Sequence, residues 1–565
     1  MIVFAENNKF TVPLNSVQLQ IAKEALHEEG RLTSILNQLG VRTEEEALAL
    51  LAWTLKMPLV DLTKSDIPNE IPANFPVKMT YRFGVFPVGH LTDGTLMVAT
   101  CNPFALDPID SIAAITGTST VPVVAYPAEL AKVIKSRLGV GAETIEGLLA
   151  QSDEEEIEVL EDVDWNNNGD AALAQEASVV RLVNDILTEA VEAGTSDIHI
   201  EAQESGMKIR YRIDGVLQTQ PMPPEINRFQ SAIVSRLKIM ARLNIAEKRV
   251  PQDGRIKIKV SDRAVDIRLS IIPMLHGEGI VMRILDKDRM NFTLKGIGMD
   301  EDIYEQFGKL IKLPHGILLV TGPTGSGKTT TLYSALNEIK SDDTKIITTE
   351  DPIEYQLDGI NQIQVHAKVG LTFAASLRAI LRHDPDVVLV GEIRDFETAE
   401  NAIQASLTGH LVFSTLHTND AAGAYTRMID MGIEPFLVST TVEGIMAQRL
   451  IRRLCKHCKE PWQPNRNEVP SDFPWEHYKE SGATIYHPVG CRQCRQTGYA
   501  GRAALYELLI PNDEVRHLAG TKAPSNEVKK VARAAGMQTL RDNGWKKVLA
   551  GITSVDEIVR TAKED

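Results

Sequence analysis

Residues 322–329 read Gly-Pro-Thr-Gly-Ser-Gly-Lys-Thr, which matches the phosphate-loop pattern G-x-x-x-x-G-K-[ST]. The glycines let backbone N–H groups turn toward a phosphate chain, and the positive end of the following helix adds to their attraction. We expect Lys328 to reach the β- and γ-phosphates of ATP and the Thr329 hydroxyl to ligate Mg²⁺. The predicted nucleotide-contacting residues are Gly322, Pro323, Thr324, Gly325, Ser326, Gly327, Lys328, Thr329 and Thr330.

A glycine-rich turn between a strand and a helix, without any ligand, is the alternative interpretation of this segment. Residues 316–321 form a buried-strand run and residues 330–339 continue as a helix, so the flanking elements are those of a phosphate loop. The simple turn explains the glycines but not Lys328 and Thr329 beside them.

Carboxylates at the ends of further predicted strands complete this chemistry. After Asp386, residues 387–390 are an apolar run that leads through Gly391 into Glu392, the candidate to hold Mg²⁺ through water or to orient the attacking water. The sequence does not choose between these two roles.

Two more predicted strands end in polar residues. Residues 345–349 lead into Glu350 and Glu354, and strand ends of open α/β sheets face the ligand crevice. Asp351, before a proline, is equally well explained as a turn former. Residues 411–415 lead to His417, which we expect either to contact the γ-phosphate or to relay strand motion; a satisfied polar group is the alternative.

Four of the five cysteines form two C-x-x-C pairs, Cys455 with Cys458 and Cys491 with Cys494. Four thiolates at this spacing predict a structural Zn²⁺ site, although the 32 residues between the pairs exceed the usual ribbon spacing of about 15 to 20. A redox pair is the alternative, and no thioredoxin-like context supports it. Cys101 is expected to be a small core residue.

Length and charge limit the remaining possibilities. The chain has 565 residues and a formal net charge of -16, which predicts several domains and argues against broad binding of nucleic acid. No segment has the length and apolar character of a secretory signal or a membrane-spanning helix, so we expect a cytosolic protein.

The pattern of elements predicts an α/β protein whose RecA-like P-loop domain follows two smaller domains. We expect an N-terminal helical and α/β docking domain at 1–140, in which Gly40 closes a helix, and an acidic flexible linker at 141–175. A second α/β domain at 176–287, a connector at 288–298 and the ATPase domain at 299–565 follow. The cysteine insertion lies at about 453–500.

Four segments together resemble the secretion ATPases of the GspE/PilB type. They are the phosphate loop, Thr-Thr-Glu-Asp-Pro-Ile-Glu-Tyr, Asp-Val-Val-Leu-Val-Gly-Glu-Ile-Arg-Asp and Ser-Thr-Leu-His-Thr-Asn-Asp. In that family they are the Walker A motif, Asp box, Walker B motif and His box. The resemblance implies a cytoplasmic homo-hexamer that uses ATP and Mg²⁺ to assemble a type II secretion pseudopilus or a type IV pilus. It also implies a similar tetracysteine insertion.

The resemblance extends to the second domain, whose arginines approach the nucleotide in the family. Arg255, Arg268 and Arg283 are the candidates here, since guanidinium groups neutralise charge on the γ-phosphate. Each is also explained by pairing with a surface carboxylate.

The N-terminal module resembles the family's more loosely. Some relatives bind cyclic di-GMP there through a repeated Arg-Leu-Gly motif, whereas Arg31-Leu32 is followed here by Thr33. We therefore expect no cyclic di-GMP binding, and docking to the cytoplasmic domains of an inner-membrane platform protein instead.

Two rival functions stay open at this point. A P-loop nucleic-acid translocase is disfavoured by the acidic balance of the chain. A nucleotide-gated scaffold that barely hydrolyses ATP is disfavoured by the intact carboxylates. The cysteine-rich segment near residue 490 favours type II secretion over pilus assembly only slightly.

Overall fold

The computed structural model describes residues 2–4, 10, 12–28, 31–65, 67–68, 72, 74–76, 79–80, 83–138, 177–260, 263–286 and 293–563. The chain divides into two compact units, Met1–Leu285 and Asp286–Asp565, and each is described by itself. The predicted linker 141–175 lies outside the described residues, as do residues 288–292 of the predicted connector. None of the described helices combines the length and apolar character that a bilayer crossing needs.

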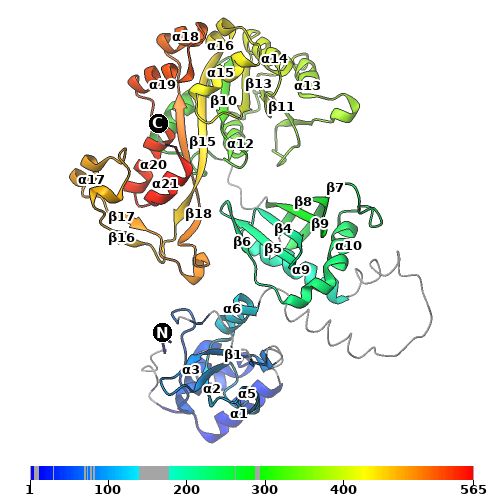
Figure 1. Cartoon of the computed structure of the whole chain (residues 1–565), viewed down its shortest axis with the longest axis vertical. Helices are drawn as coiled ribbons and strands as arrows, with labels where there is room; N and C mark the ends of the chain where they lie inside the picture. The colour runs from blue at the N-terminus through cyan, green and yellow to red at the C-terminus, as the bar shows by residue number, and fades with distance from the viewer. Residues whose placement is uncertain are drawn as a thin grey trace. The chain divides into compact units, whose positions relative to one another are not determined.

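The N-terminal part of the first unit combines short helices with a small sheet (Figure 1). Gly40 follows the second helix with a φ of 75°, the left-handed conformation expected at that position. The sheet order is β1-β2-β3, antiparallel then parallel. The elements are α1 (Ser16–Glu28), α2 (Leu36–Leu39), α3 (Glu44–Thr54), β1 (Val85–His90), β2 (Leu96–Thr100), α5 (Asp107–Thr116), β3 (Thr120–Val124) and α6 (Pro127–Leu138).

The second part of this unit is a six-stranded sheet of order β6-β5-β4-β9-β8-β7. Its inward-facing residues alternate with polar ones along β5 and β8, and they form one apolar core with the two helices. The elements are α9 (Ala177–Glu192), β4 (Asp197–Gln203), β5 (Gly206–Ile213), β6 (Val216–Thr219), α10 (Gln230–Met240), β7 (Gln252–Val260), β8 (Arg263–Met274) and β9 (Gly277–Asp286).

The second unit contains a seven-stranded sheet of order β12-β11-β13-β14-β10-β15-β18. All neighbouring strands are parallel except β15 and β18. The strands are β10 (Gly316–Thr321), β11 (Ile346–Glu350), β12 (Asn361–Gln364), β13 (Val387–Val390), β14 (Leu411–Leu416), β15 (Val442–Leu454) and β18 (Tyr499–Leu509).

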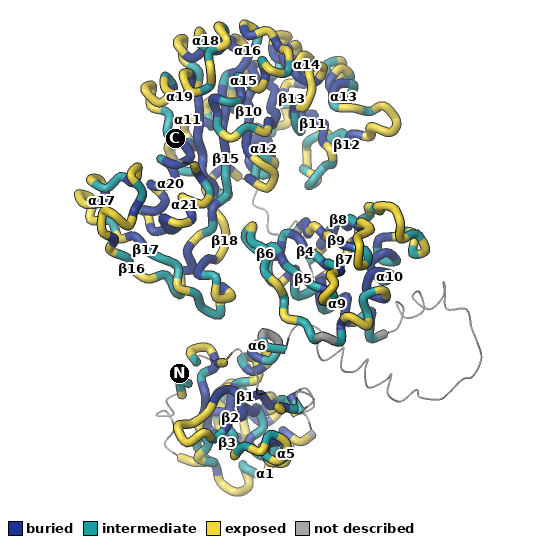
Figure 2. The backbone as a smooth tube through the Cα atoms, viewed as in Figure 1, coloured by how far each residue is buried: buried dark blue, intermediate teal, exposed yellow. Residues whose placement is uncertain are grey.

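Helices cover both faces of this sheet, which explains its continuous apolar strands. In β10, Ile317 and Leu319 join the core under α13, α14 and α15, whereas Leu318 and Val320 pack with α11 and α12. Figure 2 shows these strands as the buried centre of the unit. The helices are α11 (Glu301–Leu310), α12 (Lys328–Ile339), α13 (Phe373–Ile380), α14 (Phe396–Leu407), α15 (Ala422–Asp430), α16 (Pro435–Thr441), α18 (Asp513–Gly520), α19 (Ser525–Ala534), α20 (Leu540–Leu549) and α21 (Val555–Thr561).

Strands β15 and β18 extend beyond the sheet as a long antiparallel ribbon (Figure 1). The insertion between them consists of β16 (Glu460–Trp462), α17 (Trp475–Ser481) and β17 (Ile485–His487). Glu557 of α21 anchors the ribbon: its fully buried carboxylate accepts from Arg452 Nη2 at 2.7 Å and from Arg560 Nε at 2.9 Å. The Arg452 guanidinium also stacks on the Tyr499 ring, 3.9 Å from its centroid.

Glu557→Gln should therefore destabilise the second unit. Burial alone would raise the pKa of Glu557, but the hydrogen bonds from Arg560 and Arg452 outweigh it and hold the pKa below its ordinary value. This stabilisation is present above the ordinary glutamate pKa and is lost as pH falls through the folded-state pKa. We expect a loss of roughly 2 kcal/mol at neutral pH, measured by urea unfolding.

The matched control is Glu480→Gln, because Glu480 is exposed on α17. An equal loss of stability in both variants would contradict the anchoring role of Glu557.

Candidate nucleotide site and tetracysteine centre

The phosphate loop lies between β10 and α12, as the sequence predicted. The strand is buried throughout, the helix begins at Lys328, and Pro323, Thr324 and Gly325 are exposed. Lys328 Nζ donates to the carbonyl oxygens of Gly322 at 2.8 Å and Pro323 at 3.1 Å. The lysine thus folds back over its own loop, close to where phosphate oxygens bind in such loops.

The loop rests on strand β15, and this contact explains two of its glycines. A Cβ on Gly322 would lie 2.5 Å from the Gln448 carbonyl oxygen, and one on Gly327 would lie 2.8 Å from Gln448 Nε2. Both glycines have positive φ, 148° and 90°. Gln448 is buried and its Oε1 accepts from Thr331 Oγ1 at 2.8 Å, so the strand also holds the start of α12.

The ends of two parallel strands, β13 and β14, lie beside the loop that follows β10, as the order of the sheet requires. Glu392 follows β13 and His417 follows β14; Glu392 Oε2 lies 3.2 Å from His417 Nε2. The other carboxylate oxygen is 2.6 Å from Arg394 Nη2. Two predicted site residues are therefore in direct contact.

Burial lowers the pKa of Lys328, although the nearby Glu392 carboxylate opposes the shift. A partly desolvated ammonium group gains more from an anion than an exposed one does, because less water screens the pair.

Glu350, at the end of β11, lies in a different environment from Glu392. Its buried carboxylate accepts from the Tyr333 hydroxyl of α12, from Thr348 Oγ1 at 2.5 Å and from Gln362 Nε2 at 3.1 Å. Burial and this carboxylate raise the pKa of Tyr333. Glu350 thus joins the sheet to the phosphate-loop helix, and its oxygens are occupied by neutral donors.

The remaining predicted residues of this unit differ in exposure. Glu354 is half-buried, whereas Asp351 and Thr329 are exposed. An exposed Thr329 hydroxyl in the first turn of α12 is accessible to a hydrated cation.

Arg255, Arg268 and Arg283 all lie on the six-stranded sheet of the first unit. Arg255 of β7 is directly opposite Arg268 of β8, a placement of like charges that costs stability unless an anion or a carboxylate is close. Arg283 Nε donates to Asp197 Oδ1 at 3.0 Å. This is the pairing with a carboxylate that the sequence left open as the alternative to a role at the nucleotide.

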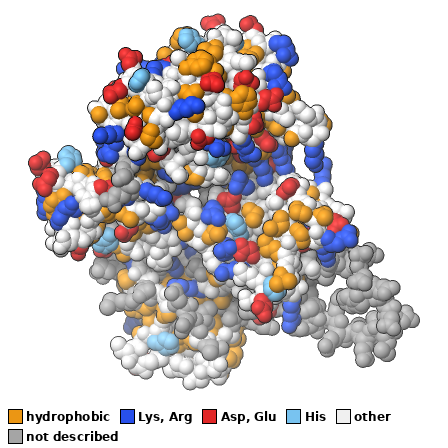
Figure 3. Space-filling model, turned by 45° about the horizontal axis from the view of Figure 1, so that its top comes forward, with side chains coloured by type: hydrophobic (Ala, Val, Ile, Leu, Met, Phe, Trp, Pro, Cys, Tyr) orange, Lys and Arg blue, Asp and Glu red, His pale blue; other side chains and the backbone are white. Residues whose placement is uncertain are grey.

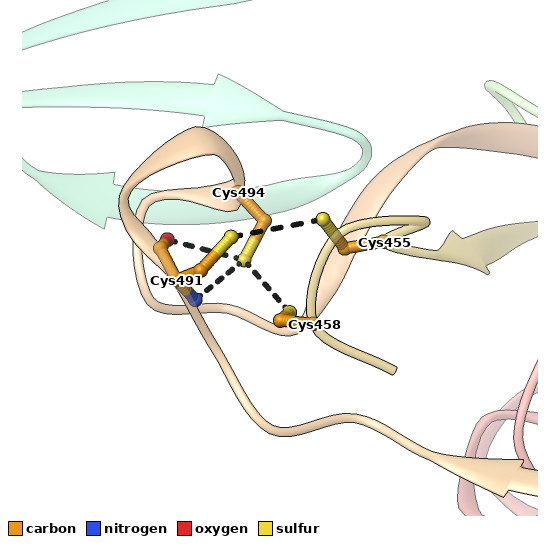
Figure 4. A group of neighbouring side chains, drawn as sticks. All are labelled: Cys455, Cys458, Cys491 and Cys494. Carbon is orange, nitrogen blue, oxygen red and sulfur yellow. Dashed lines mark hydrogen bonds between the residues drawn. The ribbon is translucent and has the colours of Figure 1, made fainter. Parts of the chain in front are cut away.

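The four paired cysteines converge, with all sulfur atoms within 4.8 Å of one another (Figure 4). Cys455 and Cys458 follow β15, and Cys491 and Cys494 precede β18. The Sγ atoms of Cys455 and Cys491 are 3.8 Å apart, and those of Cys458 and Cys494 are 3.7 Å apart. None of these cysteines is in a disulfide.

These distances fit a tetrahedral metal ion. A tetrahedron with metal–sulfur distances of about 2.3 Å has sulfur–sulfur edges of about 3.8 Å. Backbone N–H groups also point at the sulfurs: Gly490 N lies 3.4 Å from Cys458 Sγ, and Gly498 N lies 3.2 Å from Cys494 Sγ. N–H donors of this kind stabilise thiolates, so the cluster is compatible with zinc.

Sequence reasoning missed Tyr333, Arg394, Gln448 and Arg449. Arg394 follows Glu392 closely in the chain, so its spacing was a usable signal. Gln448 and Arg449 belong to β15, which is far from the loop in the chain but lies next to β10 in the sheet. No short sequence pattern around them indicates this contact.

Comparison with known proteins agrees with this arrangement. The family model described as type II/IV secretion system protein matches residues 172–560, and the model of the MshEN domain matches residues 55–142. The type II secretion system protein E of Xanthomonas campestris pv. campestris is 41% identical over 563 residues, 98% of this chain and 96% of the relative.

Two further relatives extend this picture. The type IV pilus assembly ATPase PilB of Myxococcus xanthus is 41% identical over 550 residues, 97% of this chain and 96% of the relative. The type II secretion system ATPase E of Vibrio cholerae is 50% identical over 389 residues, 69% of this chain and 76% of the relative. The chain belongs to the type II/IV secretion system protein family and is an ATPase of the GspE/PilB type, as the sequence motifs predicted.

Proposed function

We propose that the second unit hydrolyses MgATP at the phosphate loop and that the chain uses this energy to assemble a type II secretion pseudopilus. The observation that supports the chemistry best is the contact of Glu392, after β13, with His417, after β14, near Lys328 at the start of α12. Lys328 binds the β- and γ-phosphates, Thr329 ligates Mg²⁺ and Glu392 holds the metal or the attacking water.

Glu350 has a supporting role in this proposal. Its carboxylate already accepts three hydrogen bonds, so it positions β11 against α12 rather than reacting. Glu354 is the second candidate, after Glu392, to activate the attacking water. Arg255, Arg268 and Arg283 are proposed to neutralise phosphate charge within a homo-hexamer, which is typical of the family.

The 50% identity to the Vibrio cholerae ATPase supports the type II branch over 69% of the chain, whereas over nearly the whole chain the Xanthomonas type II protein E is 41% identical, as PilB is. The PilB relative matches nearly the whole chain at 41%, so pilus assembly is the alternative. Restored secretion in a strain lacking its type II ATPase, against restored piliation in a strain lacking PilB, distinguishes the two.

We propose that this protein is cytoplasmic and associates with the inner membrane through a platform protein. The N-terminal module, 1–140, is proposed to make that contact, joined through 141–175 to the domains at 176–287 and 299–565. Docking is proposed as its sole role because Thr33 interrupts the Arg-Leu-Gly motif of cyclic di-GMP binding, and the MshEN match over residues 55–142 makes that nucleotide the ligand to test. Saturable binding of cyclic di-GMP to the full chain would overturn docking as the sole role.

Nucleic-acid translocation has little support from the surface. On the face shown in Figure 3, Lys and Arg side chains are interspersed with Asp and Glu rather than gathered into one basic track. A track of that kind is what single-strand binding needs.

Lys328→Ala should reduce ATP turnover at least about 100-fold, because the loop loses the cation that offsets phosphate charge. Steady-state phosphate release measures it, and Lys312→Ala, at an exposed position after α11, should retain wild-type turnover. Unchanged turnover in Lys328→Ala would refute the site.

Glu392→Gln should bind ATP within about threefold of wild type but hydrolyse it about 100-fold more slowly, since the amide cannot hold Mg²⁺ or a proton as a carboxylate does. Equilibrium binding and single-turnover hydrolysis separate the two effects. Glu400→Gln, an exposed glutamate on α14, is the control. Wild-type hydrolysis by Glu392→Gln would favour the nucleotide-gated scaffold instead.

The tetracysteine centre is proposed to hold one structural Zn²⁺, which would fix the two ends of the insertion together. Cys491→Ser should release the metal and lower the thermal midpoint, measured by elemental analysis and calorimetry. Cys101→Ala should keep the metal, because Cys101 lies in the N-terminal module and burial raises its pKa to about 12. Wild-type protein purified without zinc would end this proposal.

A further inference from the structure

Arg449, on strand β15, lies directly against the phosphate loop. A Cβ built on Gly322 would be 3.0 Å from Arg449 Nη1, so the guanidinium packs on the first glycine of the loop. The side chain is half-buried, and it follows Gln448, whose carbonyl oxygen meets the same glycine. The second unit thus has an arginine behind the loop as well as the lysine that begins α12.

The same guanidinium also reaches the loop that follows β14. Arg449 Nη2 donates to the Asn419 carbonyl oxygen at 3.0 Å and lies 3.3 Å from Asn419 Oδ1. Asn419 is two residues beyond His417, which contacts Glu392. Thr321 reinforces this junction, since its Oγ1 accepts from the Thr418 backbone N–H at 2.8 Å. Arg449 therefore spans the phosphate loop and the His417 segment.

Arg449 has carbonyl acceptors but no ion pair among the residues that the structure describes. Asp420 and Glu507 act on Arg449 electrostatically from beyond ion-pair distance, and both have other partners. Asp420 accepts from Gly423 N at 2.8 Å and faces Lys529 at 3.8 Å, while the Glu507 oxygens accept from backbone N–H groups. Arg452, three residues along the same strand, shows the contrast, because it pairs with Glu557 at 2.7 Å.

The absence of an ion pair makes the charged form of the half-buried Arg449 side chain less stable. Arg449 and Lys328 are two cations beside one loop, and their repulsion adds to burial in lowering the pKa of Lys328. Burial likewise lowers the pKa of Arg449, although an arginine stays protonated at any physiological pH. Half-buried cations that form no ion pair are stabilised by a bound anion, and planar guanidinium groups suit phosphate oxygens.

We propose that Arg449 is a positioning residue of the ATPase reaction, which adds a second positive charge behind the phosphate loop and couples bound phosphate to the placement of His417. The inference rests on the proposed nucleotide site and goes beyond its motif residues. Its guanidinium has two separate tasks: the charge strengthens phosphate binding, and the hydrogen bonds to Asn419 hold the His417 segment for catalysis.

Two substitutions in the full-length chain separate these tasks. Arg449→Gln should weaken MgATP binding about tenfold and lower kcat about 100-fold, because it removes both the positive charge and the guanidinium N–H groups that bond Asn419. Arg449→Lys should bind MgATP within about threefold of wild type yet lower kcat about tenfold, since an ammonium keeps the charge but cannot contact Asn419 and Gly322 together.

Arg452→Gln is the matched control, because it removes an arginine from the same strand but faces Glu557. It should lower the melting temperature while leaving KM and kcat within about twofold of wild type. Each variant is checked by its melting temperature so that activity is expressed per folded chain.

The proposal is overturned if Arg449→Gln lowers only the melting temperature and leaves KM and kcat unchanged, which is the result of a purely structural role. It is also overturned if Arg449→Lys loses MgATP affinity as fully as Arg449→Gln. Lys328→Ala separates the two proposals: unchanged turnover in that variant refutes the nucleotide site itself, whereas lost turnover there together with a normal Arg449→Gln refutes only this inference.

Discussion

The close approach of strand β15 to the phosphate loop is the constraint on which the catalytic unit depends. A side chain at Gly322 would collide with the Gln448 backbone, and one at Gly327 would displace the Gln448 side chain. One side of the loop is exposed to solvent, and strand β15 supports the other side. Without that support the exposed backbone would not hold its shape. The same strand orders the start of α12 through Thr331 and Gln448, so one surface positions both the loop and the first turn of the helix that follows it.

Sheet order then decides which side chains share that surface. Strands β13, β14 and β10 are consecutive in the sheet and parallel, so their carboxyl ends lie at one edge. Glu392 and His417 meet there although they come from separate crossover units. This is the usual place for a ligand in an open α/β sheet, because strand ends are where the loops can diverge.

The buried charged side chains are of two kinds. One kind stabilises the fold, and the other is suited to bind a ligand. Glu350, Glu507 and Glu557 are buried carboxylates whose oxygens accept several hydrogen bonds, and they join distant elements. Within the described part of the chain, Lys328 and Arg449 donate to carbonyl oxygens and form no ion pair. Carboxylates with several hydrogen bonds stabilise the fold, whereas cations without an ion pair beside an exposed loop are suited to an anion that binds and leaves.

Features that are local in the chain could be predicted from the amino-acid sequence alone. The phosphate loop between a strand and a helix, the strand-end residues Glu392 and His417, and the two cysteine pairs each depend on spacing over a few residues, and the structure places each set together. Only the tertiary structure decided that Glu350 is occupied by Tyr333 and that Gln448 and Arg449 lie under the loop. Those contacts depend on which strands and helices become neighbours, and that order is set by packing of the whole sheet rather than by any short pattern of residues.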